Sequence, residues 1–171
     1  MIREATLDDY EQIARLHAEN WQTTYRGVLS DDYLDNKVLQ ERLSSWKDRF
    51  VNPKPNQKTI VFVQDKEIVG FAGAFSNYDS KWGTYLDSLH VSSKCRGMGI
   101  GRKLLDQITQ WAADHSQMLF LWVIVQNEGA TQFYQRLGAS LEDIQNDVFP
   151  DGTLITAQRC VWTLPITTTT T

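Results

Sequence analysis

The stretch "CRGMGIGRKLLDQI", residues 95–108, decides the fold, because it places three glycines at alternate positions where a helix is predicted to begin. Apolar residues then recur at helical spacing from Ile100 to Ala112, which is typical of an amphipathic helix. Unpaired amides and the positive end of the dipole make a helix N-terminus favourable for an anion. One glycine would suffice for a tight turn, so three glycines flanked by Arg96 and Arg102 predict an anion-binding loop.

Two common phosphate-binding loops do not match this stretch. A Walker loop requires a Ser or Thr after its lysine, but Lys103 follows Arg102 and precedes Leu104. A dinucleotide fingerprint requires a glycine at position 102 and opens the first βαβ unit, whereas this loop lies past the middle of the chain. The loop is therefore expected to hold a different anionic ligand.

The motif Arg96-x-x-Gly99-x-Gly101 matches the Q/R-x-x-G-x-G/A signature for acyl-CoA in the GNAT superfamily of N-acetyltransferases. Around it, "LDSLHVSSKCRGMGIGRKLL" (86–105) resembles the fourth strand and third helix of that family. The segment "VIVQNEGATQFYQRLGA" (123–139) resembles its fifth strand and fourth helix. The similarity in element order covers nearly the whole chain and implies the GNAT fold.

Hydrophobic periodicity and turn residues predict the order β-α-α-β-β-β-α-β-α-β-β. The predicted strands are 2–5, 59–64, 68–76, 85–93, 118–126 and two strands within 139–164, and a loop is expected at 76–84. The predicted helices begin at Thr6, at the cap residue Ser30, at Ile100 and at Ala130. This is an α/β protein with a mixed, mostly antiparallel central sheet flanked by helices. A single domain over 1–171 is expected, with a frayed tail at about 166–171.

Composition excludes several classes of protein. The 171 residues carry a net charge of −4 with no basic run, so no nucleic-acid partner is expected. The chain has no apolar run long enough for a membrane span and no signal peptide at its start. The two cysteines are isolated and the three histidines have no metal spacing, so a cytoplasmic protein without a metal is expected.

The resemblance implies acetyl-CoA as co-substrate. The family lays its fourth strand beside the pantetheine arm, and the glycine-loop amides hold the pyrophosphate. Asn127 matches the family's asparagine near the pantetheine, and it would also cap the following helix. The cofactor-binding residues implied are Leu89, His90, Val91, Arg96, Gly97, Met98, Gly99, Ile100, Gly101, Arg102, Asn127 and Tyr134.

The resemblance also implies that Tyr134 is catalytic and protonates the departing thiolate; its other reading is a packed aromatic residue. The general base is open, because Tyr85 stands where some relatives carry a glutamate. By strand alternation Asp87 lies on the same face as Tyr85, where it would act through a water or bind the substrate ammonium; a structural hydrogen bond is the alternative. The same alternation points His90 to the opposite face.

The acceptor in this family binds between the first two helices, where Trp21 and Tyr25 stand as substrate-binding candidates with Tyr85 and Asp87. The alternative is that both aromatic residues belong to the core. The implied reaction is acetyl transfer to a primary amine of a small molecule. The alternatives are a protein N-terminal acetyltransferase and a catalytically silent acyl-CoA sensor. A homodimer is possible, with the apolar strand "CVWTLPI" (160–166) as the candidate surface.

Overall fold

The fold is organised around a seven-stranded sheet with the order β1-β2-β3-β4-β5-β7-β6. A computed structural model describes residues 1–166; the rest of the predicted tail, 167–171, lies outside the described residues. The strands are β1 (Ile2–Glu4), β2 (Gln57–Gln64), β3 (Glu67–Asp79), β4 (Gly83–Val91), β5 (Met118–Ile124), β6 (Ser140–Val148) and β7 (Leu154–Thr163). Only the β4–β5 pair is parallel, which confirms the mixed, mostly antiparallel sheet.

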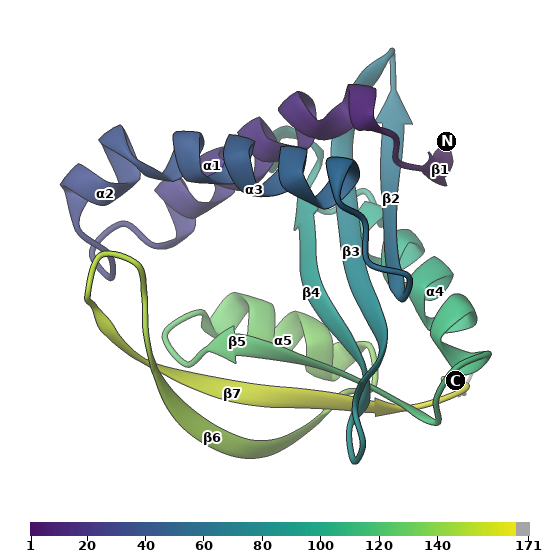
Figure 1. The fold of residues 1–171 in the computed structure, drawn as a ribbon. Coiled ribbons are helices and arrows are strands. Elements are labelled where there is room, and N and C mark those ends of the chain that lie inside the picture. Colours follow the sequence, from purple (N-terminus) through teal and green to yellow (C-terminus); the bar gives the residue numbers. More distant parts are fainter. Residues whose placement is uncertain (167–171) are drawn as a thin grey trace.

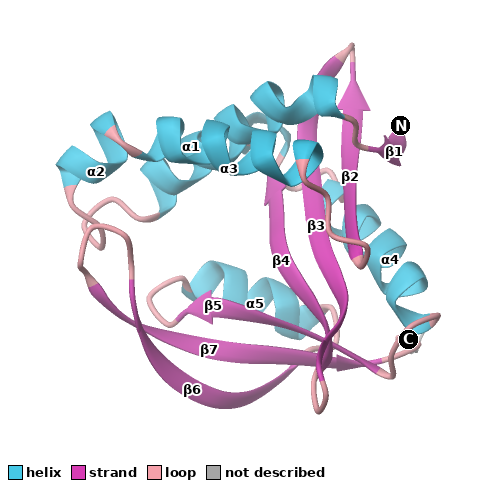
Figure 2. Ribbon diagram, in the orientation of Figure 1, coloured by secondary structure: helices cyan, strands magenta, loops and turns pink. Residues whose placement is uncertain are grey.

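Helices cover both faces of the first half of this sheet (Figures 1 and 2). The helices are α1 (Tyr10–Thr24), α2 (Asp31–Asn36), α3 (Val38–Val51), α4 (Ile100–Ala113) and α5 (Glu128–Arg136), with short 3-10 turns at Leu7–Asp9 and Ser93–Cys95. Helices α1 and α3 bury Ile13 and Trp46 against Phe71 of β3. The apolar stripe of α4, including Leu104 and Ile108, packs on the opposite face of the sheet. We call these the α1/α3 face and the α4 face.

Two element boundaries differ from the sequence predictions. Ser30 caps a helix as predicted, accepting a bond from the Tyr33 amide, but the helical run divides at Lys37, whose φ of −125° leaves helical geometry. The predicted loop at 76–84 is mostly strand, since β3 extends to Asp79 and β4 begins at Gly83. The Asp79 carboxylate accepts from the amides of Lys81 and Trp82 at 2.8 and 2.9 Å, which stabilises a shorter turn.

The C-terminal segment suggested as a dimer surface lies in the core instead. Cys160, Val161 and Trp162 are at most 3% exposed, and Leu164 is 8% exposed. Strand β7 is internal because it pairs with β5 on one side and with β6 on the other. The apolar side chains of this segment therefore pack in the core, and only Thr163 and Pro165 within it are exposed; the homodimer stays a prediction.

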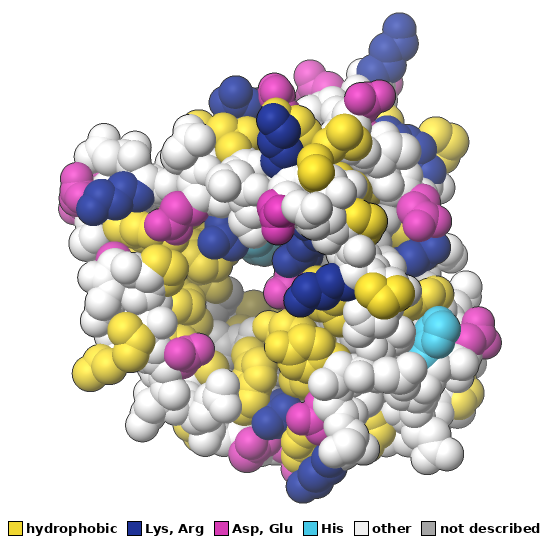
Figure 3. All heavy atoms as spheres, in the orientation of Figure 1, with side chains coloured by type: hydrophobic (Ala, Val, Ile, Leu, Met, Phe, Trp, Pro, Cys, Tyr) yellow, Lys and Arg dark blue, Asp and Glu magenta, His cyan; other side chains and the backbone are white. Residues whose placement is uncertain are grey.

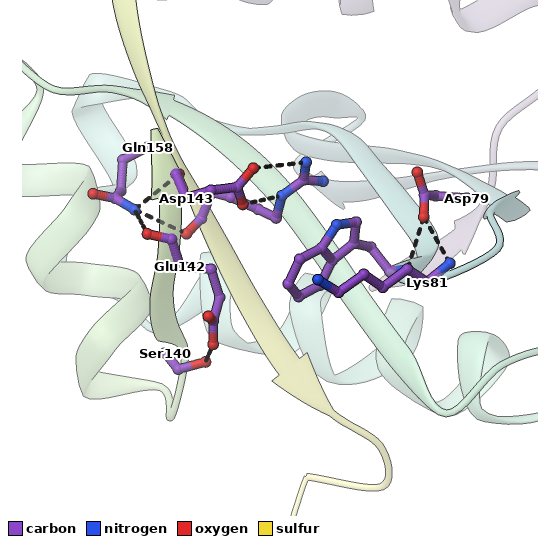
Figure 4. A network of polar contacts seen from close by, with 8 residues as sticks. Asp79, Lys81, Ser140, Glu142, Asp143 and Gln158 are labelled. Carbon is purple, nitrogen blue, oxygen red and sulfur yellow. Dashed lines mark hydrogen bonds and ion pairs between the residues drawn. The ribbon is translucent and has the colours of Figure 1, made fainter. Parts of the chain in front are cut away.

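Polar side-chain contacts stabilise the β6–β7 hairpin at the end of the sheet (Figure 4). The pairing slips between Leu141 and Ile144, which leaves backbone carbonyls of β6 without ladder partners. The Gln158 amide donates to the carbonyls of Glu142 and Asp143 at 3.0 and 3.2 Å. Arg159 binds the Asp143 carboxylate through two nitrogens at 2.6 and 3.2 Å. These contacts hold the hairpin whose turn reaches the site described below.

Candidate active site

Strands β4 and β5 separate after a short stretch of pairing, and a cavity opens where they part. Their only paired residues are Thr84 with Leu119 and Tyr85 with Phe120. Beyond Tyr85 the two strands diverge (Figure 1), so one edge of β4 and one edge of β5 lack strand partners there. The cavity has a volume of about 1010 Å³. Figure 3 shows the molecule hollowed at its centre, with Lys or Arg and acidic side chains at the edge of the hollow.

The glycine loop forms one end of this cavity. The structure gives a separate physical reason for glycine at each of its three positions. Gly97 and Gly99 have φ values of 79° and 75°, in the left-handed region that L side chains rarely adopt. Gly101 is required by packing, because a Cβ there would lie 3.1 Å from the Phe133 ring. A Cβ on Gly97 or Gly99 would meet no atom within 4 Å, so the space beside the loop backbone is open.

The backbone amides of this loop are available to a ligand. Among the described residues, the amides from Arg96 to Arg102 donate to no acceptor; the first helical bond of α4 runs from the Lys103 amide to the Gly99 carbonyl. No side chain caps α4. Consecutive unpaired amides at the positive end of a helix dipole are suited to an anion, so the anion-binding role of the loop stays a prediction that this geometry allows.

The predicted loop residues do not all face the cavity. Those that line it are Arg96, Gly97, Gly99, Ile100, Gly101 and Arg102. Met98 is 55% exposed and does not line it, so any contact from Met98 comes from its backbone. Leu89, His90, Val91, Asn127 and Tyr134 also line the cavity, which brings the remaining predicted cofactor residues to one site.

A β-bulge at Asp87 overturns the predicted facing of His90. Ser88 pairs with Gly73 and Leu86 pairs with the next residue of β3, so Asp87 has no partner across the pair. A bulge adds one residue and reverses the alternation beyond it. His90 consequently lies on the α1/α3 face with its ring centroid 4.4 Å from that of His17, on the same side as the Asp87 contact to α3. The prediction that His90 and Asp87 face opposite sides is wrong.

Asp87 forms an ion pair with an arginine of α3. Its Oδ2 lies 2.8 Å from Nη1 of Arg49, and both side chains are largely buried. The same guanidinium lies over the Trp46 ring at 4.4 Å. Asp87 also lines the cavity, so the carboxylate is an ion-pair partner in the wall of the site; its roles toward water or a substrate ammonium stay predictions.

The Tyr134 hydroxyl projects from α5 without a protein partner. The ring packs edge-on against Trp162 at a centroid distance of 5.7 Å, and the hydroxyl makes no hydrogen bond to any described residue. Burial, followed by the neighbouring Tyr25 and Cys160, raises the pKa of the Tyr134 phenol above its ordinary value. The phenol is therefore protonated at neutral pH.

Asn127 caps α5, as its alternative role predicts. Its Oδ1 accepts from the Ala130 amide at 3.2 Å, and Asn127 also lines the cavity. The Oδ1 atom of Asn127 accepts the hydrogen bond that caps the helix. The side chain also lies close enough to Tyr25 to act on the pKa of its phenol through a hydrogen bond. Helix capping and ligand binding are thus compatible at this residue.

Two neutral histidines lie side by side on the α1/α3 face. The Trp46 indole donates a 3.0 Å hydrogen bond to Nδ1 of His17, which places the proton of the neutral ring on Nε2. Burial first, then the charges of Arg42 and Arg96, lowers the pKa of His90 to about 4. Burial and the adjacent His90 lower the pKa of His17 well below its usual value.

The wall of the cavity toward the acceptor candidates is aromatic. Trp21 stacks on Phe149 of the β6–β7 turn at 5.3 Å and meets Tyr25 edge-on at 5.2 Å. Tyr85 stacks on Phe120 at 5.1 Å. Trp21, Tyr25 and Tyr85 all line the cavity while also packing on neighbours, so core packing and a place in the site coexist.

Apart from Trp21, the cavity residues that α1 and α3 contribute were not identified from the sequence. His17 and Asn20 on α1, with Arg42 and Arg49 on α3, line the cavity. A signal for the arginines was present, because Arg42 and Arg49 share a helical face with Trp46, where a surface helix would bury only apolar residues.

Within residues 1–166, no group of three or more His, Cys, Asp or Glu side chains is placed to hold a metal ion. None of the described helices has the length and apolar character needed to cross a membrane.

Comparison with known proteins gives a consistent result. The sequence pattern of the acetyltransferase (GNAT) family matches residues 11–139. YuaI of Bacillus subtilis, named an uncharacterized N-acetyltransferase, is 30% identical over 139 residues, which span 78% of this chain and 76% of YuaI.

Solved structures share the fold at lower identity. The paia N-acetyltransferase of Thermoplasma acidophilum in complex with coenzyme A aligns with a TM-score of 0.71 and 20% identity, over 92% of this chain and 96% of that one. The structure of yncA from Salmonella typhimurium with acetyl-CoA aligns with a TM-score of 0.69 and 17% identity, over 100% and 97% of the two chains.

Proposed function

The chain belongs to the acetyltransferase (GNAT) family, and on that premise we propose that it transfers an acetyl group from acetyl-CoA to a primary amine of a small molecule. One observation carries the proposal. The unpaired amides of the glycine loop, the edge of β4 that lacks a strand partner and the Tyr134 hydroxyl all open into the same cavity, although the Val91 carbonyl at that edge accepts from Asn20 at 3.1 Å. An anion site, a peptide-like binding edge and a proton donor in one cavity match the three parts of an acyl-CoA.

The residues present fit coenzyme A. The amides between Arg96 and Arg102 would hold the pyrophosphate, because the bare backbone at Gly97 and Gly99 allows a close approach. The edge of β4 over Leu89 to Val91 would pair with the amide groups of the pantetheine arm, as an added strand does. The acetyl thioester supplies the activated acyl group.

The chain's own groups would then handle charge and protons. Amides of β4 beyond the bulge would polarise the thioester carbonyl. Tyr134 would donate its proton to the departing sulfur, since its raised pKa keeps the phenol protonated and its hydroxyl has no competing partner among the described residues.

The amine must reach the thioester without its proton. Five arginines and two aspartates line the cavity, and the phosphates of bound coenzyme A would compensate the arginines of the glycine loop. The arginines are Arg42, Arg49, Arg96, Arg102 and Arg136, and the acids are Asp87 and Asp147. Asp87 is the one residue that we name as a candidate for the general base.

A thiol-release assay with acetyl-CoA over a panel of small primary amines and N-terminal peptides tests the proposal. Saturable, amine-dependent thiol release with small amines is the expected result. Turnover of peptides alone would instead select a protein N-terminal acetyltransferase. Tight binding of coenzyme A with no turnover of any amine would select a silent sensor.

A further inference from the structure

Helix α3 presents two arginines to the cavity on one helical face. Arg42 and Arg49 are seven residues apart, about two helical turns, with Trp46 between them. The Arg42 guanidinium carbon lies 4.9 Å from the Trp21 ring centroid, and that of Arg49 lies 4.4 Å from the Trp46 ring centroid. Stacking on tryptophan holds each guanidinium in place and leaves its N–H edges available to a partner.

Only one of these two charges is compensated. Arg49 forms an ion pair with Asp87 at 2.8 Å. Arg42 makes no ion pair within 4.0 Å to any acidic group of residues 1–166. A partly buried guanidinium without a counter-ion is costly, and a bound anion would remove that cost.

Most of the unsatisfied buried polar atoms belong to residues that line the same cavity. In the described part of the chain, four buried side-chain atoms lack a hydrogen-bond partner: Nε of Arg42, Nη1 of Arg49, Oγ1 of Thr59 and Oγ of Ser88. All but Thr59 line the cavity. Nη1 of Arg49 is close to Asp87 but not aligned with it for a hydrogen bond, and Ser88 is only 5% exposed. A buried donor without an acceptor destabilises the protein, so a ligand that accepts from it is favoured.

The position of Arg42 separates it from the arginines of the phosphate site. Arg96 and Arg102 belong to the glycine loop and the start of α4, and α4 packs on the opposite face of the sheet from α3. Arg42 instead stacks on Trp21, on the aromatic side assigned to the acceptor. Arg42 and Arg96 both act on His90, but Arg42 reaches the cavity from α3 and stacks on an acceptor candidate, whereas Arg96 reaches it from the glycine loop.

We propose that the amine acceptor carries a carboxylate, which the Arg42 guanidinium binds. The planar fork of arginine matches a carboxylate in two parallel hydrogen bonds. A polyamine would bring further positive charge beside Arg42 and would leave its guanidinium without a counter-ion. The inference rests on the proposed acetyl transfer and names the class of acceptor.

Matched pairs of acids and their decarboxylated amines test this class directly. L-phenylalanine with 2-phenylethylamine and L-lysine with 1,5-diaminopentane each differ only by the carboxylate. We expect kcat/KM of the acid to exceed that of its decarboxylated partner by at least about 10-fold, the lower end of what a hydrogen bond to a charged group contributes. Calorimetric titration of the same compounds into the protein saturated with coenzyme A gives a second measure, independent of turnover.

The variant Arg42→Gln identifies the residue responsible. It should lower kcat/KM and affinity for the acids by about 10- to 100-fold, and change those of the decarboxylated amines and the KM of acetyl-CoA by less than about twofold. Arg15→Gln, which removes an exposed arginine of α1 outside the cavity, should change none of these.

The outcomes separate this inference from the proposed function. If the acids bind through Arg42 but are not acetylated, the carboxylate site at Arg42 stands and the proposed acetyl transfer to them fails. If amines are acetylated equally with and without a carboxylate, the function stands and the inference is wrong. Absence of binding by every acid, or a raised KM for acetyl-CoA in Arg42→Gln, also overturns it.

Discussion

Tyr134 has the two properties that a proton donor to a thiolate requires, a raised pKa and a hydroxyl with no hydrogen bond to a described residue. Tyr134→Phe removes the proton donor and keeps the edge-on packing against Trp162. We expect kcat to fall by about 10²-fold, with the KM of acetyl-CoA nearly unchanged, because the lost contact serves the departing sulfur.

Steady-state thiol release measures this change, and Tyr78→Phe is the matched control, since Tyr78 is 57% exposed and does not line the cavity. Equal activity of Tyr134→Phe and the unaltered protein would assign Tyr134 to packing alone.

The buried His90 makes stability depend on pH. In the folded protein it stays neutral down to about pH 4, whereas the unfolded chain takes up the same proton near pH 6.5. The contribution of neutral His90 to the free energy of unfolding is therefore fully present above about pH 6.5. It is lost progressively as the pH falls toward 4. The free energy of unfolding from urea titrations should therefore decline over this range, and His90→Gln should flatten the decline.

His115→Gln is the control, because His115 is exposed. A decline that persists unchanged in His90→Gln would assign the pH dependence to other groups, with the neighbouring His17 the first to test.

At the scale of an element, the left-handed backbone of the glycine loop is expected to set the affinity for coenzyme A. Gly99 has a φ of 75° at the N-cap of α4 with open space beside it, so Gly99→Ala introduces backbone strain without a clash. The strain of about 1–2 kcal/mol should displace the loop amides and raise the Kd of coenzyme A about tenfold. Isothermal titration calorimetry measures this Kd directly.

Gly27→Ala is matched in strain, because Gly27 has a φ of 85° and open space but lies outside the cavity. Both variants should lose similar stability, and only Gly99→Ala should lose affinity. An equal loss of affinity in both would show that the effect is general destabilisation.

Secondary structure could be predicted from the sequence where the hydrophobic periodicity is regular. The predictions were wrong where a single residue interrupts that periodicity. The sequence predicted α4 and the order of strands, because the apolar repeats and turn residues are unambiguous. It placed His90 on the wrong face, since a bulge at Asp87 inserts one residue without changing the hydrophobic pattern. It also missed the division between α2 and α3 at Lys37, which no glycine or proline marks.

At the scale of the whole molecule, the cavity lies where the two halves of the sheet part, so a bound coenzyme would bridge them. A ligand that binds only the folded state at about 100 times its Kd adds about 2.7 kcal/mol. For a chain of this length we expect coenzyme A to raise Tm by about 5–10 °C in differential scanning calorimetry. No shift for the unaltered protein, or an equal shift in Gly99→Ala at the same concentration, would argue against the loop as the binding site.

The overall arrangement also limits what the sequence could reveal about the site. The candidate cofactor-binding residues lie close together in the chain, from Leu89 to Arg102 and from Asn127 to Tyr134, so a sequence motif could point to them. The residues of the opposite wall, such as His17 and Arg42, come from helices far away in sequence and meet the cavity only through tertiary packing. The net charge of −4 hides an arginine-rich interior surface for the same reason.

The most direct test is a crystal structure of the protein with coenzyme A. Diphosphate oxygens should lie at hydrogen-bonding distance from the backbone nitrogens of the loop between Arg96 and Arg102, with the sulfur beside the Tyr134 hydroxyl. Electron density for the diphosphate at another place on the surface, or a sulfur far from that phenol, would contradict the account.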